Sequence, residues 1–321
     1  MTECDLTLYK YTKFGALQLY RTQHDYRDWI PQSSHITPII ALPSWRGRRT
    51  ITQMNYSADA ISAAMWRVAV GSAVMQVGLT LLLRILPRPW SDKPAYLAHH
   101  AISMAAVTFM AITGCSEWFG RMTRPSTAEG RFWDRHPAGD MLAHFMFTHM
   151  IAWDIPCRLI VPSLRDPTML AHHAAAALVA YCGLHAGAQT SLTYYSTYFF
   201  GVTELSSVPL HVLTLFKPGQ ILHEHLNQSP LCAMVNQAAR LSFSATFLAL
   251  RAVHFPYVTV CYTLDCWHLL FVSTHAMTLS ESVAMVVIAL CNWALMGLQL
   301  YWARIIIRAL ARQLSGRSKS D

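Results

Sequence analysis

Seven stretches of mostly apolar residues run along this chain, and each is close to the length that crosses a lipid bilayer. They cover residues 61–85, 96–119, 141–161, 168–188, 192–216, 233–260 and 278–310. A transmembrane helix needs about 20 such residues, because the hydrocarbon core is about 30 Å thick. Backbone groups in lipid must be satisfied within each segment, and these segments lack the apolar–polar alternation of a β-barrel. We therefore expect an all-α, polytopic membrane helix bundle of about seven transmembrane helices.

The low content of charged residues indicates a membrane protein. Only 13% of the 321 residues are charged and 53% are hydrophobic, whereas soluble domains carry about 25% charged residues. The net charge of +8 comes mostly from cations at segment ends and in the C-terminal tail. Cations in these places flank membrane spans, so the charge does not indicate nucleic-acid binding.

The cysteines and the N-terminus indicate neither a metal site nor a cleaved leader. The 8 cysteines lie mostly inside apolar runs and form no CxxC pair, which argues against a zinc site or a disulfide framework. Cys261 and Cys266 would pair only in an oxidising lumen, and buried free thiols are the favoured interpretation. The first 30 residues contain no apolar core of a signal peptide.

Short connections divide the chain into one membrane domain with two flanking parts. We expect a polar N-terminal region (1–60), a first transmembrane helix with its linker (61–94), a membrane domain (95–310) and a basic tail (311–321). The C-terminal end is rich in arginine and lysine, which predicts a cytosolic C-terminus. Seven spans would then place the N-terminus in the lumen.

Ionisable residues within the apolar segments are the candidates for a functional site. A charge at mid-span costs about 2.5–3.5 kcal/mol on insertion scales, so it usually faces the bundle interior and a partner. Asp154 lies four residues before Arg158, a spacing that allows an ion pair on one helical face. Arg251 lies near mid-span, and we predict that Glu204 or Asp154 lies within salt-bridge distance of it.

The fourth segment contains two adjacent histidines. Neighbouring residues on a helix point about 100° apart, so we expect only one of His172 and His173 to reach the bundle centre. His173, Tyr181 and His185 fall roughly along one stripe, and imidazoles exchange protons near neutral pH. Hydrogen bonding to neighbouring helices explains these residues equally well.

The fifth segment places polar residues on one face. Glu204, Ser207 and His211 follow i, i+3, i+7 spacing, so they share a side of a helix. Pro209 lies between them and predicts a kink or hinge, because proline removes a backbone hydrogen bond from the helix interior.

Six motifs in this chain resemble those of the TLC domain family and occur in the same order. They read AHHAISMAAVTF (98–109), THMIAWDIPCRL (148–159), LAHHAAAALVAY (170–181), TELSSVPLHVL (203–213), SATFLALRAVHFP (244–256) and LQLYWARIIIR (298–308). This family includes translocating-chain-associating membrane proteins, longevity-assurance ceramide synthases and lipid-homeostasis proteins. The resemblance spans roughly residues 95–310 and implies a six-helix core plus one further helix, in the endoplasmic reticulum.

Departures from the family pattern bear on the activity that the resemblance implies. Ceramide synthases carry a second His–Asp pair where this chain reads Thr203-Glu204-Leu-Ser-Ser, so that pair is absent. The Glu-Leu-Ser form is closer to the TLC-domain-containing lipid-homeostasis proteins. His211 stands where those proteins usually have asparagine.

Two functions follow from the resemblance. The first is the handling of acyl chains or sphingolipids, or membrane lipid homeostasis. This function assigns no particular chemical reaction to the protein. The alternative is a ceramide-synthase-like N-acyltransferase that uses acyl-CoA as a substrate. In that case His172 and His173 would be the general base or acyl carrier, oriented by Glu204 and Asp154. The polar core would contain Arg251, Ser207, His211, Tyr181 and His185.

Other classes of protein fit the sequence less well. A di-iron oxygenase would need HxxxH and HxxHH clusters, and the histidine pairs of this chain lack those spacings. A transporter or channel would use the buried charges as a relay, but no inverted repeat or pair of broken helices supports it. We expect no metal and no resident cofactor. The expected partners are membrane lipids and not nucleic acid, and homo-oligomerisation is left open.

Overall fold

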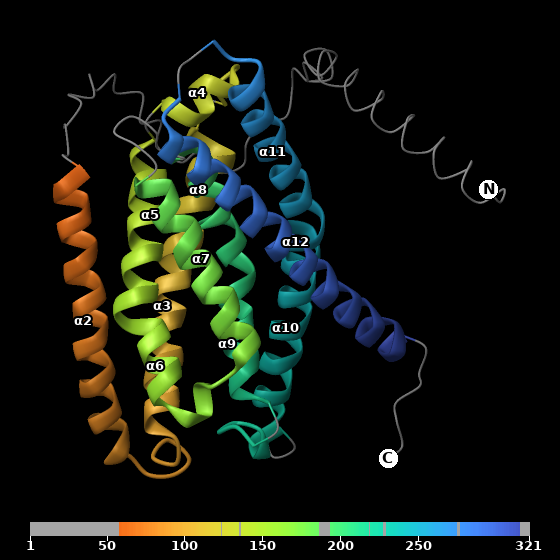
Figure 1. The fold of residues 1–321 in the computed structure, drawn as a ribbon. Coiled ribbons are helices and arrows are strands. Elements are labelled where there is room, and N and C mark those ends of the chain that lie inside the picture. Colours follow the sequence, from red (N-terminus) through yellow and green to blue (C-terminus); the bar gives the residue numbers. More distant parts are fainter. Residues whose placement is uncertain are drawn as a thin grey trace, which may run out of the picture. The chain divides into compact units, whose positions relative to one another are not determined.

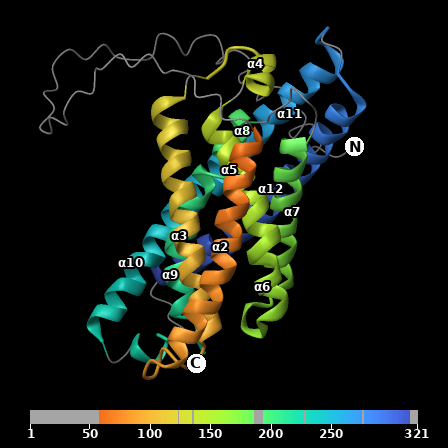
Figure 2. The ribbon, with the colours of Figure 1, turned by 90° about the vertical axis from the view of Figure 1, so that its left-hand side faces the viewer.

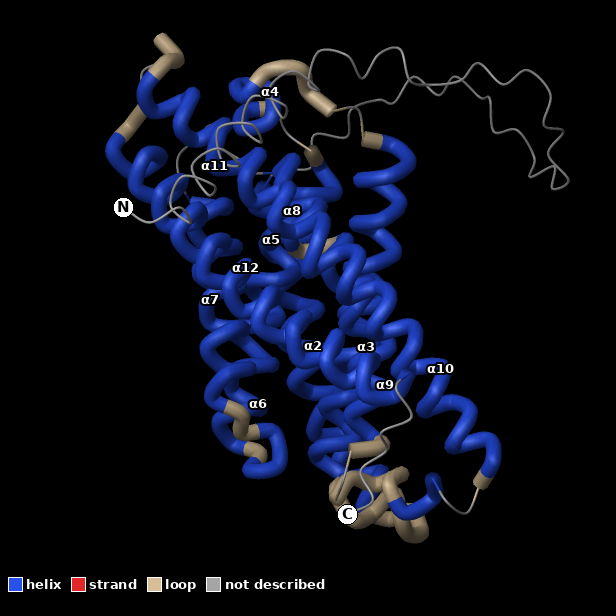
Figure 3. Tube along the Cα trace, turned by 90° about the vertical axis from the view of Figure 1, so that its right-hand side faces the viewer, coloured by secondary structure: helices blue, strands red, loops and turns tan. Residues whose placement is uncertain are grey.

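The computed structural model describes residues 58–122, 124–134, 136–185, 193–217, 219–226, 229–274 and 277–314. The predicted polar N-terminal region and the end of the basic tail lie outside these ranges. Within them the chain forms helices and turns and no strand (Figure 3). The expected all-α architecture is therefore confirmed.

The helices run up and down the bundle in chain order (Figure 1). They are α2 (Ala58–Arg84), α3 (Pro94–Ser116) with η1 (Glu117–Arg121), α4 (Ala128–Trp133), α5 (Pro137–His149), η2 (Met150–Asp154), α6 (Ile155–Ile160), η3 (Pro162–Leu164), α7 (Pro167–His185), α8 (Thr193–Phe199), η4 (Val202–Ser206), α9 (Ser207–Leu215), η5 (Glu224–Leu226), α10 (Pro230–Thr246), η6 (Phe247–His254), α11 (Phe255–Phe271) and α12 (Leu279–Leu314).

Four of the described helices are long and apolar enough to cross a membrane. They cover Ala60–Arg84, Pro94–Arg121, Pro230–Phe271 and Leu279–Arg312. The remaining predicted segments are also helical, but they are shorter, interrupted or richer in polar residues. The protein is thus an all-α membrane helix bundle, and the count of seven spans stays a prediction.

Helix α3 lies inside the bundle, whereas α2 lies at its edge. Helix α3 packs against α2, α5, α9 and η4. Helix α2 packs on α3 and α5 and lies in front of the bundle in Figure 2. It exposes large apolar side chains along its length. Helix α12 packs across α7, η6 and α11. Aromatic side chains from α8 fill the core between these layers, including Tyr194, Tyr195 and Tyr198.

The expected long loop at 123–140 contains a short helix, α4. Its first turn is capped by Thr127, whose hydroxyl accepts a hydrogen bond from the Gly130 N–H at 3.0 Å. Arg131 of α4 donates to both carboxylate oxygens of Asp265 in α11, each at 2.6 Å. The hydroxyl of Tyr195 binds the same carboxylate. We call Arg131, Asp265 and Tyr195 the Arg131 cluster, and it ties α4 to α11 and α8.

The fifth segment breaks at a point before Pro209, where the sequence predicted a kink or hinge. Helix α8 ends at Phe199, and Gly201 leads into the 3₁₀ turn η4. Pro209 is the third residue of α9, where a backbone N–H has no partner within the helix in any case. The sixth segment was predicted to end at residue 260, but the helix continues to Phe271.

The break at Gly201 coincides with a close approach of two backbones. A Cβ on Gly114 of α3 would lie 2.3 Å from the Gly201 Cα, and one on Gly201 would lie 2.5 Å from the Gly114 Cα. Only glycine fits at both positions, because a Cβ at either one would collide with backbone atoms of the facing segment, which cannot move aside as a flexible side chain can. This contact fixes the turn that leads into Glu204 against α3.

The cysteines of the described segments are free thiols, including Cys261 and Cys266.

Candidate functional site

A cavity of about 600 Å³ lies inside the helix bundle. We call it the central cavity, and it is lined by residues of α3, α5, η2, α6, η3, α7, α8, η4, α9, α10, η6, α11 and α12. Its wall carries apolar side chains such as Val107, Met110, Phe199, Phe247 and Leu295. It also carries most of the polar candidates that the sequence indicated, namely Asp154, Arg158, His172, His173, Glu204, Ser207, His211 and Arg251.

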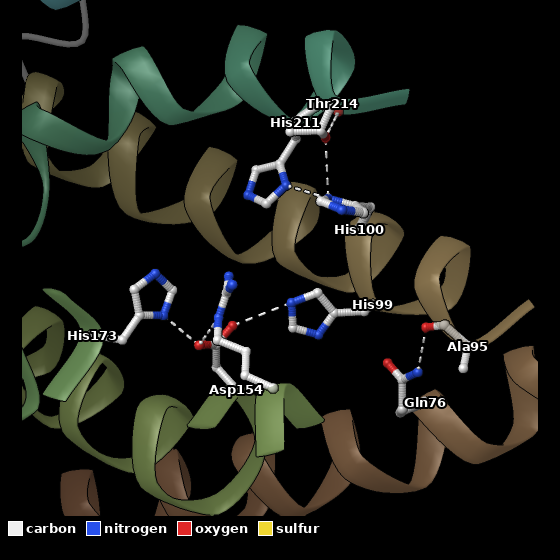
Figure 4. A network of polar contacts seen from close by, with 9 residues as sticks. Gln76, Ala95, His99, His100, Asp154, His173, His211 and Thr214 are labelled. Carbon is white, nitrogen blue, oxygen red and sulfur yellow. Dashed lines mark hydrogen bonds and ion pairs between the residues drawn. The ribbon is translucent and has the colours of Figure 1, made fainter. Parts of the chain in front are cut away.

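Asp154 binds three basic side chains from three helices. Its Oδ2 accepts a hydrogen bond from Arg158 Nε at 2.8 Å and contacts His173 Nδ1. Its Oδ1 lies 3.3 Å from His99 Nε2. Figure 4 shows Asp154 between His173 and His99. We call these residues the Asp154 cluster, and the predicted pair of Asp154 and Arg158 is confirmed.

The Asp154 cluster orients the imidazole of His173. The carboxylate engages Nδ1, so Nε2 is the ring nitrogen left for a ligand. In Figure 4 that nitrogen points away from Asp154. A carboxylate in this position fixes the ring orientation, as it does for the histidine of a catalytic triad. His99 is fully buried and stacks on Trp153, with ring centroids 4.6 Å apart, so it supports the carboxylate from behind.

Arg251 is held by the turn that precedes α9. Its Nη2 lies 3.3 Å from Glu204 Oε1 and donates to Ser207 Oγ at 3.0 Å. Its Nε donates to Ser206 Oγ at 2.7 Å and to the Thr203 carbonyl at 3.1 Å. The predicted ion pair of Arg251 and Glu204 is therefore confirmed. We call Arg251, Glu204, Ser206 and Ser207 the Arg251 cluster.

Asp154 and Arg251 both lie in π-helical turns that are followed by a proline. Asp154 ends η2 two residues before Pro156, and Arg251 lies in η6 shortly before Pro256. Each proline lacks an N–H and crowds the carbonyl four residues earlier, which lies within the π segment. Widening to a π turn accommodates the proline, and such bulges occur frequently at functional sites. The two X-Pro steps are thus a sequence signal for both clusters.

His100 and His211 form a separate contact across the cavity. Their Nδ1 atoms lie 3.0 Å apart, and Thr214 Oγ1 lies 3.4 Å from His100 Nδ1 (Figure 4). His211 therefore faces α3, while Glu204 and Ser207 contact Arg251. The three residues of the predicted shared face line one cavity but belong to two contacts.

Two predictions about α7 are changed by the structure. His172 and His173 both line the cavity, so the prediction that only one reaches it is wrong. Met169, His172, His173 and Ala176 follow i, i+3, i+4, i+7 spacing, so the two histidines lie on either side of the centre of one face.

Tyr181 and His185 lie away from the cavity. Tyr181 is 47% exposed and stacks on His185, with ring centroids 4.5 Å apart, and both rings also contact Phe147. Neither residue lines the cavity. The stripe through His173 thus turns outward toward the C-terminal end of α7.

Sequence reasoning missed several residues of the site. His99 and His100 lie in the first quoted motif but were not selected, because the pattern does not reveal their partners. His149, Asn292 and Gln299 also line the cavity. Among the described residues, no group of three or more His, Cys, Asp or Glu has the geometry to hold a metal ion.

These features define a class of protein, a polytopic α-helical membrane protein with ionisable groups gathered around an internal cavity. The family model of the TLC domain matches residues 96–308. The chain belongs to the TLC domain family, whose members are membrane proteins tied to lipid metabolism or homeostasis. No curated protein and no solved structure matches the sequence.

Proposed function

We propose that this protein holds an acyl-chain lipid in the central cavity and acts in the handling of acyl lipids or sphingolipids. The observation that carries the proposal is the mixed wall of the cavity, which presents apolar side chains together with ionisable ones. Its volume of about 600 Å³ falls within the range of about 300–1,000 Å³ for ligand pockets. The lipid chain would pack against residues such as Met110 and Phe247, with its polar group beside the Asp154 and Arg251 clusters.

The distribution of charges supports a cytosolic C-terminus. Arg304, Arg308 and Arg312 lie in the last turns of α12, with no acid between them. Cations accumulate on the cytosolic side of membrane proteins, and the family supports the endoplasmic reticulum.

The pattern around Glu204 supports lipid handling over lipid synthesis. The chain lacks the second His–Asp pair of the ceramide synthases, and Glu204 pairs with Arg251 instead of with an imidazole. A role close to the lipid-homeostasis proteins of the family fits this arrangement better.

N-acyl transfer is a second candidate, favoured by the contact of His173 with Asp154. In this reaction His173 accepts a proton from an amine as the amine attacks the carbonyl of an acyl thioester. The C–N bond forms, the C–S bond breaks, and the thiolate leaves with the proton that His173 had accepted. Acyl-CoA would be the substrate, and Arg158 would stabilise the charge of Asp154 throughout.

Lipid binding is tested by filling the cavity. Ala106 is buried on α3 and lines the cavity, whereas Ile112 on the same helix is 66% exposed. We expect Ala106→Trp to lose the lipid that copurifies with the protein, measured by native mass spectrometry. Ile112→Trp adds the same bulk outside the cavity and should retain the lipid. Equal lipid content in the two variants would contradict the proposal.

Acyl transfer is tested by incubating purified protein with labelled acyl-CoA and a long-chain base. An N-acylated product that disappears in His173→Ala and Asp154→Asn, and persists in His185→Ala, would establish the enzyme. His185 is a matched control because it lies on the same helix but outside the cavity. Lipid retention without any product would leave lipid handling as the function.

A further inference from the structure

Two amide side chains of α12 line the central cavity in the middle of an apolar helix. From residue 283 to residue 303, Asn292 and Gln299 are the only residues of α12 with an amide or charged side chain. They are seven residues apart and therefore share one face of the helix. Leu295 and Trp302 line the cavity on that same face. Both amides are only 1% exposed.

Each amide has a buried polar atom without a hydrogen-bond partner among the described residues. These atoms are Nδ2 of Asn292 and Oε1 of Gln299. The imidazoles of His149 and His172 also line the cavity, and the Nδ1 atom of each is buried and unpartnered in the same part of the chain. Buried polar groups in proteins are nearly always paired, and leaving one unpaired is strongly unfavourable. The concentration of such groups around one cavity indicates a polar ligand.

The chemistry of these groups specifies an uncharged ligand group. Amides and imidazoles supply both donors and acceptors without a fixed charge. Among the fixed charges that line the cavity, Asp154 is paired with Arg158 and Glu204 with Arg251. Asp166 and Lys217 lie in connections between helices, whereas Asn292 lies well inside α12. A free carboxylate or phosphate would be held better near Arg158 and Lys217. An amide or hydroxyl group suits the wall formed by α12.

We propose that Asn292 and Gln299 recognise an uncharged amide or hydroxyl group of the lipid in the central cavity. This inference rests on the proposed binding of an acyl lipid and adds the class of ligand and the residues that select it. The protein then prefers lipids with a hydrogen-bonding group next to the hydrocarbon chain over chains that lack a donor.

The experiment compares two uncharged probes with the same chain. N-(2-hydroxyethyl)palmitamide carries an amide and a hydroxyl, whereas ethyl palmitate carries an ester without a donor. Binding to the full-length protein in detergent is measured by titration, with melting temperature as a second readout. We expect the wild-type protein to bind the hydroxyamide about tenfold more tightly than the ester.

Variants of the two amides separate recognition from folding. Asn292→Leu and Gln299→Met keep a similar side-chain volume. We expect both variants to bind the ester as the wild type does, and to bind the hydroxyamide no more tightly than the ester. Their melting temperature without ligand should not fall, because each removes an unpaired buried group. Thr259→Val is the matched control. Its hydroxyl is also buried and unpartnered within the described chain, but Thr259 does not line the cavity, so the preference should persist.

The outcomes distinguish this inference from the proposed function. Equal binding of both probes by the wild type, or an unchanged preference in Asn292→Leu and Gln299→Met, would overturn the inference while lipid binding stands. Failure of the wild type to bind either probe would overturn the proposed lipid binding itself. Loss of the preference in Thr259→Val as well would show that the effect is not specific to the cavity and would also overturn the inference.

Discussion

The Arg131 cluster and the Asp154 cluster are both buried and charged, but they differ in what surrounds them. In the Arg131 cluster, both oxygens of Asp265 bind Arg131, and Tyr195 and the Pro125 carbonyl complete the contacts. None of these three side chains lines the central cavity. In the Asp154 cluster, Asp154, Arg158 and His173 all line the cavity.

This difference gives the Arg131 cluster a structural role and makes the Asp154 cluster the candidate for function. A polar network that is complete within the protein has no capacity left for a ligand, and it serves to connect helices. A network at the wall of a cavity retains donors and acceptors for another molecule. The presence of a buried ion pair alone therefore does not indicate a site, whereas its position beside a cavity does.

The largest effect is expected from breaking the Arg131 cluster on one side. Arg131→Met leaves the Asp265 carboxylate buried without its counter-charge, which should cost about 3–5 kcal/mol of folding free energy. We expect a large fall in melting temperature in detergent. The double variant Arg131→Met, Asp265→Leu should recover much of the loss, and its failure to do so would contradict a role limited to the ion pair.

A smaller loss of stability is expected at the cavity. Asp154→Asn keeps the shape of the side chain but removes the charge that binds Arg158 and His173, at a cost of about 1–3 kcal/mol. Both side chains line the cavity, where water or a ligand can solvate them after the change, and this limits the loss. Lipid retention should nevertheless fall more than in Arg131→Met protein that remains folded. The opposite order in lipid retention would invalidate the distinction between the two clusters.

Glu204→Gln is expected to have a still smaller effect. Arg251 keeps Ser206, Ser207 and the Thr203 carbonyl as acceptors, so the loss should be about 1 kcal/mol. Thermal unfolding of Glu204→Gln beside Asp154→Asn would measure this. A loss as large as that of Arg131→Met would mean that the Arg251 cluster is structural.

The smallest effect is expected at His185. His185→Ala removes a ring that stacks on Tyr181 at the outer side of α7, so the change in stability should stay within about 0.5 kcal/mol. Lipid retention should match the wild type. A measurable loss of lipid in this variant would mean that the outer side of α7 also contributes to binding.

The helical bundle and several charged pairs could be predicted because they depend on spacing along the chain. Asp154 and Arg158 are four residues apart on one helix, and the charge of Arg251 required an acid within the bundle. The position of the helix break was not predictable from Pro209, because it depends on the contact of Gly201 with Gly114 far away in the sequence. The Arg131 cluster was missed for the same reason, since α4 and α11 are separated by more than one hundred residues.

The contact between Gly114 and Gly201 has a consequence for how the site can change. Helix α3 carries His100, and the segment that begins at Gly201 carries Glu204 and Ser207, so two parts of the cavity wall touch through backbone atoms alone. Because no flexible side chain lies between them, a displacement of one part moves the other. A ligand that displaces the Gly201 segment together with Arg251 would therefore also tilt α3 and its histidines.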